Sequence, residues 1–591
     1  MVFFCVNLTD KVFCVRFLII FLIISLMAFS LFSQRNLGGE GLLTPNNVAL
    51  WFVAIILISL AAFKVITQNK IAVSIFGLSL ALGLTLILSF SLIESAPSDF
   101  GVGIFVLAFL GIFLFWIALE QWKISHQQFL MILLALTVLG GVHSAVSIVQ
   151  IHDPHHVAFT LTGYLPLNLA GNQPIGIVQQ VNMTATLMAT FGLIGLYLTS
   201  YGLFNRISVL WRFWVFLSVV MALYVLILSG SRAGLLAFSL GLILLFFSRH
   251  KWLRKKILRP FIWLSLIGAA YLLALWLPGL TVSNELLQNK FDKLLLGTDI
   301  RWFLYLTSWD MFLQSPWLGY GLGGYNTALV NYVATVGVDP RFEYLDLQNI
   351  LHPHNELLYW VLQAGLVALL VFVGLAIFYL KLLFKRRLGF ALGILALSVP
   401  ILSQTQLSYP FSLSALHLFL LLFLLQYGVQ PYVSIIRFSL SGAIQKISYV
   451  GLLLLFSGCT YFSWFTLKSV EDLYAFKYRL FLTAGQTTQE ISEMRYFEYA
   501  SNHPVFKTGV EDVMNRTLIR SLDTNNRYDM QRFIWWAEEY EFDDLSLRTL
   551  VNLTKAHLSL EQIEQAELVY IQAIKMYPNA VDLKILKAQI Y

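Results

Sequence analysis

Charged residues are scarce in this chain. Only 12% of its 591 residues are Asp, Glu, Lys or Arg, whereas 58% are hydrophobic, and the mean hydropathy is +0.73. So few charges cannot cover the surface of a soluble protein of this size. The composition therefore excludes an ordinary water-soluble protein and predicts an integral membrane protein.

Metal-ligating and redox motifs are also missing. The three cysteines, Cys5, Cys14 and Cys459, have none of the spacings of a metal site or a redox pair. Of the 32 acidic residues, 18 lie in the last 125 positions, which leaves 14 for residues 1–466. The crowded HDPHH at 152–156 keeps a metal site open as an alternative, but a solvated loop is favoured. We expect no metal and no other cofactor.

Long apolar runs dominate residues 1–466. A span of about 20 helical residues crosses the hydrocarbon core, and helices are expected because the runs lack the alternation of barrel strands. We predict an all-α integral membrane protein with about 13 transmembrane helices. The thirteen candidate spans are 17–33, 47–66, 71–93, 101–119, 127–150, 181–201, 211–228, 233–248, 260–278, 356–380, 388–403, 411–428 and 447–466.

The distribution of Lys and Arg predicts the orientation. With the N-terminus in the cytoplasm, 19 of the 39 basic residues fall at cytoplasmic positions, six in external connections and 14 in the last 125 residues. This agrees with the positive-inside rule. The net charge of +7 therefore reflects topology and does not indicate nucleic-acid binding. A signal peptide over residues 1–33 is the alternative to a retained first helix, which we favour.

Three external regions are large enough to hold a site or a module: 151–180, 279–355 and the residues from 467 onward. The transmembrane domain, 1–466, includes a long external loop at 279–355, and 467–591 forms an external helical domain of ordinary soluble composition. Near the end of that domain, five residues have the spacing of a tetratricopeptide unit: Leu553, Ala566, Tyr570, Ala573 and Pro578. A docking surface and a helical cap are equally compatible with this pattern.

The stretch LHPHNELLYW at 351–360 predicts a base at the start of a helix. Pro353 disfavours helix at His352, and Asn355 is a good N-cap for the apolar run that follows. His354 would then lie at the outer membrane surface, where the helix terminus disfavours its charged form. A neutral imidazole can accept a proton. The alternative is that the two histidines are polar anchors at the interface.

Two arginines in external segments extend this hypothesis. Arg232 lies in SGSRAG at 229–234, and Arg301 lies beside aromatic residues at 298–312. An arginine near hydrocarbon is costly and tends to have an anionic partner, and guanidinium suits phosphate. A base and two arginines on one side predict transfer from a lipid diphosphate, with an ion pair or headgroup anchor as the alternative for each arginine.

Other polar motifs are less specific. Gln180 and Asn182 enter the sixth span, where amides bind sugar hydroxyls or hold helices together. The glycine-rich LGYGLGGYN at 318–326 lacks the Lys-Ser/Thr ending of a P-loop, so we interpret it as a tight turn.

These motifs together resemble the O-antigen ligase superfamily, and within it the bacterial protein O-oligosaccharyltransferases of the PglL type. The resemblance covers residues 170–430 and rests on SGSRAG, SPWLGYGLGGYN, HPHNELLYWVLQAGLVALL and QLSYPFSLSALHLFLLLF. It implies metal-independent, inverting transfer of an oligosaccharide from undecaprenyl diphosphate to Ser or Thr hydroxyls of periplasmic proteins or pilin. The enzyme would be a multi-pass protein of the bacterial inner membrane, with its site and C-terminal domain in the periplasm.

The resemblance also implies roles for individual residues. His354 is similar to the base, with His352 as its neighbour, and Arg232 and Arg301 are similar to the arginines that bind diphosphate. Gln180 and Tyr409 are similar to residues of the QPN and YPF motifs, although QVN replaces QPN here. Two alternatives stay open. One is ligation of O-antigen to lipid A-core, or polymerisation of repeat units, and the other is a non-enzymatic transporter of the lipid-linked glycan.

Overall fold

The structure is a computed structural model and describes most of the chain. The described residues are 21, 23–34, 36–37, 41–93, 101–152, 173–255, 258–277, 300–336, 350, 352–482, 499–503, 506–539, 545–578 and 580–590. They form two compact units: unit 1 comprises 1–84, 109–296 and 372–464, and unit 2 comprises 85–108, 297–371 and 465–591.

Ten described helices are long and apolar enough to cross a membrane, so the protein is a multi-pass membrane protein. Two shorter apolar helices, Phe105–Glu120 and Leu388–Gln404, coincide with two more of the predicted spans. In the predicted span at 17–33, residues 21 and 23–28 are helical and η1 (Phe29–Leu31) is a 3-10 helix, whereas residues 17–20 and 22 lie outside the described part of the chain, so the number of thirteen stays a prediction. The ten helices are α2 (Pro45–Gln68), α3 (Ile75–Ile93), α5 (His126–His152), α7 (Val181–Thr199), α9 (Val209–Leu228), α10 (Arg232–Leu253), α11 (Leu258–Trp276), α15 (Glu356–Phe384), α18 (Ala415–Val429) and α19 (Gly442–Leu482).

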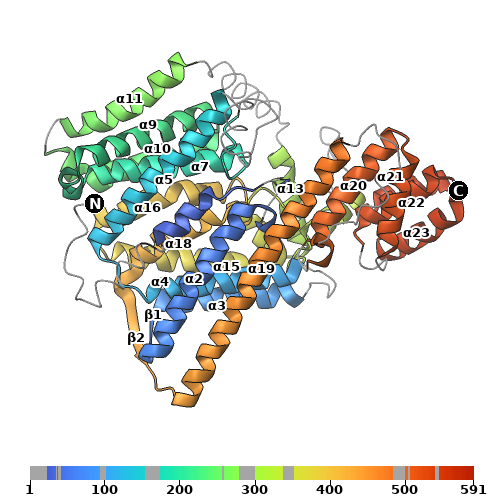
Figure 1. Cartoon of the computed structure of the whole chain (residues 1–591), viewed down its shortest axis with the longest axis horizontal. Helices are drawn as coiled ribbons and strands as arrows, with labels where there is room; N and C mark the ends of the chain where they lie inside the picture. Colours follow the sequence, from blue (N-terminus) through green and yellow to red (C-terminus); the bar gives the residue numbers. More distant parts are fainter. Residues whose placement is uncertain are drawn as a thin grey trace. The chain divides into compact units, whose positions relative to one another are not determined.

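Helix α7 forms the centre of unit 1. Of the 18 most apolar consecutive residues of α7, 89% are buried, because the helix packs against α5, α9, α10 and α16 (Leu388–Gln404) (Figure 1). Small residues allow these close contacts: a Cβ on Gly195 would lie 2.2 Å from Cγ2 of Val219, and one on Gly234 would lie 2.8 Å from Cβ of Ala185. Both the beginning and the end of α7 are therefore held at fixed positions among its neighbours.

The predicted span at 71–93 does not begin as a helix. Residues Lys70–Ser74 form strand β1, which pairs with β2 (Val433–Arg437) in an antiparallel sheet with Lys70 opposite Arg437 (Figure 1). Both segments are rich in β-branched residues, which favour strands. At the end of α4 (Gly101–Glu120), the side-chain amide of Gln121 bonds both backbone groups of Ala72, at 2.9 and 2.8 Å. The prediction of a helix was therefore wrong for residues 71–74.

Unit 2 contains a break in α15. At Gly365 (φ 62°, ψ −152°) the chain leaves the helical conformation, and the loop at 316–323 pairs with the exposed backbone. Tyr320 N donates to Leu362 O at 2.7 Å, and Leu366 N donates to Pro316 O at 2.7 Å. The loop follows α13 (Ile300–Gln314) and precedes α14 (Tyr325–Val336). The break therefore fixes both helices against the first half of α15, and its polar backbone groups are satisfied within the protein.

The predicted tight turn at 318–326 is part of this loop. Gly319, Gly321 and Gly323 all have φ between 72° and 78°. A Cβ on Gly319 would lie 2.4 Å from Leu362 O, and one on Gly365 would lie 2.2 Å from Trp317 O. Only glycine permits this approach of two backbones.

The last residues of unit 2 form helical hairpins, as the sequence predicts. The helices are α20 (Lys507–Asp523), α21 (Arg527–Glu538), α22 (Leu547–Ser559), α23 (Ile563–Met576) and α24 (Val581–Ile590). The two hairpins α20–α21 and α22–α23 turn in the same way: Asn525 (φ 53°) and Glu561 (φ 65°) occupy equivalent positions. Leu553, Ala566, Tyr570 and Ala573 are buried between the helices, as expected for packing positions of a helical repeat. Pro578 is exposed.

Candidate active site

The structure places the predicted site residues in two groups. The first group belongs to unit 1 and consists of Gln180, Asn182, Arg232 and Tyr409, and the second belongs to unit 2 and consists of Arg301, His352 and His354.

Three residues of the first group, Gln180, Asn182 and Arg232, lie where α7 and α10 begin. The hydroxyl of Ser231 donates to Oδ1 of Asn182 at 2.9 Å and accepts from the backbone N–H of Gly234 at 3.3 Å. Ser231 therefore caps α10 and also joins it to the first turn of α7. Arg232, the first residue of α10, is half-buried at this junction.

Gln180 immediately precedes α7. Its backbone is extended (φ −147°, ψ 129°), and its side chain makes no cap hydrogen bond. The Oε1 atom is buried and has no hydrogen-bond partner among the described residues. The turn before it is held from α5, where Oε1 of Gln150 accepts from Gly176 N at 2.8 Å. A buried acceptor without a hydrogen bond costs free energy, so Oε1 of Gln180 is suited to accept a hydrogen bond from the hydroxyl group of a ligand.

Tyr409 lies in the connection between α16 and α18. It precedes the short helix α17 (Pro410–Leu413), and it is half-buried. Five residues earlier, Oε1 of Gln404 accepts from the hydroxyl of Thr186 on α7 at 3.1 Å. Asn47 of α2 holds the other end of α17, because its Oδ1 accepts from Ala415 N at 2.8 Å. The connection that carries Tyr409 is thus anchored on both sides.

The electrostatics of this end of unit 1 favour an anion. Two long helices present their N-termini there, and each carries a partial positive charge and unsatisfied N–H groups. Arg232 adds a full charge at the same junction. Helix N-termini with a nearby guanidinium are well suited to phosphate.

In the second group, His352 holds the backbone of His354. Nδ1 of His352 accepts from the N–H of His354 at 3.0 Å, and the two rings are 4.4 Å apart at 82°. Because Nδ1 is an acceptor, the proton of the neutral ring is on Nε2. Burial, and to a smaller extent the nearby His354, lowers the pKa of His352 to about 2. His352 is therefore neutral at physiological pH.

His354 has an unusual backbone conformation. Its φ is +55°, which is rare for a residue other than glycine and requires support from its surroundings. His352 provides that support at the N–H, and the hydroxyl of Tyr305 donates to the carbonyl of His354 at 3.2 Å. Tyr305 lies one helical turn after Arg301 on α13. The same helix therefore carries the arginine and fixes the histidine.

The helix begins after His354, as predicted. Oδ1 of Asn355 accepts from Leu358 N at 3.0 Å, and α15 starts at Glu356. Oε1 of Glu356 accepts from Nε1 of Trp360 at 3.1 Å, and the carboxylate is buried at the positive end of the helix. Half-buried His354 thus stands at the entrance of a capped helix.

The sequence analysis did not predict two residues, Ser231 and Tyr305, that hold the site residues in place. Ser231 is an N-cap type that precedes an apolar run, so its capping role is readable from SGSRAG. Tyr305 could be placed on the same helix face as Arg301, but its contact with residue 354 spans 49 positions. No local pattern indicates such a pair.

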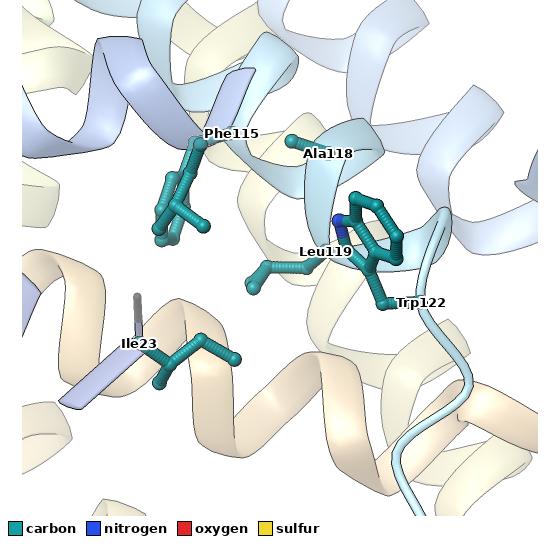
Figure 2. A pocket seen from close by; sticks show the side chains of 6 residues that line it. Ile23, Phe115, Ala118, Leu119 and Trp122 are labelled. Carbon is teal, nitrogen blue, oxygen red and sulfur yellow. The ribbon is translucent and has the colours of Figure 1, made fainter. Parts of the chain in front are cut away.

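Two other features carry less chemistry. An apolar hollow in unit 1 is lined by Ile23, Leu57, Phe115, Ala118, Leu119 and Trp122 (Figure 2). Figure 2 shows mainly hydrocarbon around it, so it offers no acid, base or charge. In the HDPHH segment, Nε2 of His152 lies 2.6 Å from the hydroxyl of Tyr224, and the other four residues lie outside the described part of the chain.

The comparison with protein families gives one match. A family model described as O-antigen ligase matches residues 217–373, a range that contains Arg232, Arg301, His352 and His354. The comparison with curated proteins gives no match. The family match supports the O-antigen ligase superfamily and ligase-type glycosyl transfer in a membrane.

Proposed function

We propose that this protein transfers an oligosaccharide from undecaprenyl diphosphate to Ser or Thr hydroxyls of proteins in the periplasm, pilin among them. The observation that supports it most is the buried, neutral His352, which holds His354 at the start of α15. The family match over the same residues supports the class of reaction.

In the proposed reaction His354 acts as the base. The acceptor hydroxyl attacks the anomeric carbon as its proton passes to a ring nitrogen of His354. The new bond joins the acceptor oxygen to the sugar, and the bond between the anomeric carbon and the phosphate oxygen breaks. Attack from the face opposite the leaving group inverts the anomeric centre. A half-buried imidazole is suited to this task because a ring nitrogen without a proton can accept one.

Arg232 and Arg301 would bind the diphosphate, which gains negative charge as it leaves. A guanidinium can donate two parallel hydrogen bonds to phosphate oxygens and thereby stabilise that charge. The two helix N-termini beside Arg232 would add to this, and Oε1 of Gln180 would accept from a sugar hydroxyl. In this proposal Asn182 holds the helix junction and Tyr409 contacts the glycan or the acceptor.

Ligation of O-antigen to lipid A-core is the second candidate. The description of the matched family favours it. The helical hairpins of α20–α24 favour a protein acceptor instead, because arrays of this kind commonly bind other proteins.

The test compares cells that carry the wild-type protein with cells that carry His354→Ala. Mass spectrometry of periplasmic and pilus proteins should find a glycan mass on a serine- or threonine-containing peptide in the wild type alone. A glycan found on lipid A-core in its place would support the second candidate. If the variant cells carry the glycan on the same acceptor as the wild-type cells, His354 has no part in the reaction.

A further inference from the structure

A second group of arginines lies at the other end of unit 1. Arg249 is near the end of α10, and Arg386 directly follows the last turns of α15. Since Arg232 begins α10, the two ends of this helix carry separate arginines. The end with Arg249 and Arg386 is the one predicted to be cytoplasmic.

Arg249 is packed on aromatic rings and is only partly hydrogen-bonded. Its guanidinium carbon lies 4.0 Å from the ring centre of Tyr201, and one terminal nitrogen donates to the carbonyl of Ser200 at 3.0 Å. Its Nε is buried and has no acceptor among the described residues. A buried charged donor without an acceptor costs free energy, so an anionic acceptor would stabilise this arrangement.

Arg386 is arranged in a similar way. Its guanidinium carbon lies 3.6 Å from the ring centre of Phe390, and one nitrogen donates to the carbonyls of Tyr427 and Gly428 at 3.3 and 3.1 Å. Both arginines thus cap the C-terminus of a neighbouring helix with one nitrogen, Arg249 on α7 and Arg386 on α18. The remaining donors of each guanidinium make no hydrogen bond with the described residues.

His126 connects the two arginines. Nδ1 of His126 lies 3.2 Å from the hydroxyl of Tyr427, and the backbone carbonyl of Tyr427 accepts from Arg386. On the other side, the ring centre of His126 lies 5.1 Å from that of Tyr201, on which Arg249 packs. The ends of five helices, α5, α7, α10, α15 and α18, therefore bring the two arginines close to the phenol rings of Tyr201 and Tyr427.

No described carboxylate of unit 1 neutralises these cations. Glu120 is the single acidic residue of unit 1 within the described part of the chain, and it accepts from Ser74 and Trp116 instead. Helix C-termini offset only part of two full charges. Basic pockets between membrane-spanning helices on the cytoplasmic side typically bind lipid headgroups.

We propose that Arg249 and Arg386 bind the phosphate group of an anionic phospholipid headgroup. Each guanidinium would direct its remaining N–H groups at phosphate oxygens. A free phosphate offers the same chemistry. The headgroup is favoured because the arginines lie at the ends of membrane-spanning helices, where headgroups are at high local concentration.

The experiment measures lipid retention by the full-length protein in native mass spectrometry. The probe is phosphatidylglycerol, and phosphatidylcholine serves as the lipid without net charge. We expect the wild type to retain one phosphatidylglycerol in preference to phosphatidylcholine. In R249Q/R386Q the apparent affinity for phosphatidylglycerol should fall about a hundredfold or more, because at least one charge-assisted hydrogen bond is lost at each of the two positions.

K251Q/R437Q is the matched control, because it removes the same charge from two exposed positions. Equal loss in the control, or no loss in R249Q/R386Q, would overturn the proposal. R249K/R386K keeps both charges and can still cap the helix ends, so it covers the case in which the glutamine variant does not fold. It should bind more weakly than the wild type, since an ammonium cannot form the fork, and wild-type affinity would count against the site.

Competition with inorganic phosphate shows whether the site binds a lipid headgroup or free phosphate. Displacement of the retained lipid by excess phosphate would assign the site to phosphate ions in general, whereas retention would assign it to the complete headgroup. Wild-type protein that prefers neither lipid and does not bind phosphate would contradict both forms of the proposal.

Discussion

The backbone N–H of His354 donates to Nδ1 of His352 at 3.0 Å. This bond fixes the proton of the buried His352 on Nε2 and makes His352 a positioning residue for the residue that we propose as the base. In our proposal the two histidines of one short motif therefore have different tasks, which their spacing alone does not reveal.

Substitution of His352 should separate these tasks. His352→Leu leaves the N–H of His354 without its acceptor, at a cost of about 1–3 kcal/mol, and glycan transfer should fall about fivefold or more. His352→Asn places an amide oxygen near the same N–H and should recover part of the rate. His354→Asn should lose transfer completely, measured as glycosylated acceptor in a purified assay. Equal rates for the Leu and Asn variants would contradict a positioning role.

Tyr305→Phe should lower the rate without weakening donor binding. The variant loses one hydrogen bond to the carbonyl of His354, worth about 0.5–1.5 kcal/mol, so kcat should fall about two- to tenfold. KM for the lipid-linked donor should stay unchanged, because Arg301 on the same helix is kept. A change in KM alone would show that Tyr305 acts on the donor instead.

Arg232→Lys and Arg301→Lys should each reduce transfer about tenfold or more. Lysine keeps the charge but cannot form two parallel hydrogen bonds with a diphosphate. Arg437→Lys, at an exposed position of β2, is the control and should be active. Wild-type rates in both site variants would favour the alternative that these arginines anchor lipid headgroups.

Gly365→Ala should destabilise the protein strongly. The new Cβ would lie 2.2 Å from the carbonyl oxygen of Trp317 and would also require φ near +62°, with an expected cost above about 3 kcal/mol. Gly374→Ala on the same helix is the control, because no described atom lies within 4 Å of its Cβ. Thermal unfolding in detergent should show a lower midpoint for the first variant only.

Acid should loosen the contact between α19 and the residues that precede α20. Nε2 of His503 lies 3.0 Å from the hydroxyl of Thr466, and burial lowers the pKa of His503 to about 4. The unfolded form, with a pKa near 6.5, takes up a proton between about pH 6.5 and pH 4, whereas the folded form does not. Stability therefore falls as the pH falls through this window. The protection of residues 499–503 against hydrogen exchange, relative to the intrinsic rate at each pH, should fall in the wild type and fall less in His503→Gln.

The sequence predicts the parts of this structure that depend on neighbouring residues. The cap at Asn355, the start of α15 and most apolar helices follow from patterns within a few turns. Strand β1 was missed because its partner, β2, lies more than 350 positions later, and an apolar run alone cannot distinguish a strand from a helix. The positive φ of His354 depends on Tyr305, and the break at Gly365 depends on the loop at 316–323. Both are contacts between distant segments.

The pairing between the loop at 316–323 and α15 is made mainly by main-chain atoms. Its strength therefore does not depend on the chemical nature of nearby side chains such as those of Trp317 and Leu318. Side chains at positions 317 and 318 can therefore change without loss of the pairing, whereas Gly319 and Gly365 cannot gain a Cβ. Evolutionary constraint in this loop and helix should concentrate on Gly319 and Gly365, so that two of the smallest residues in the chain would tolerate the least variation.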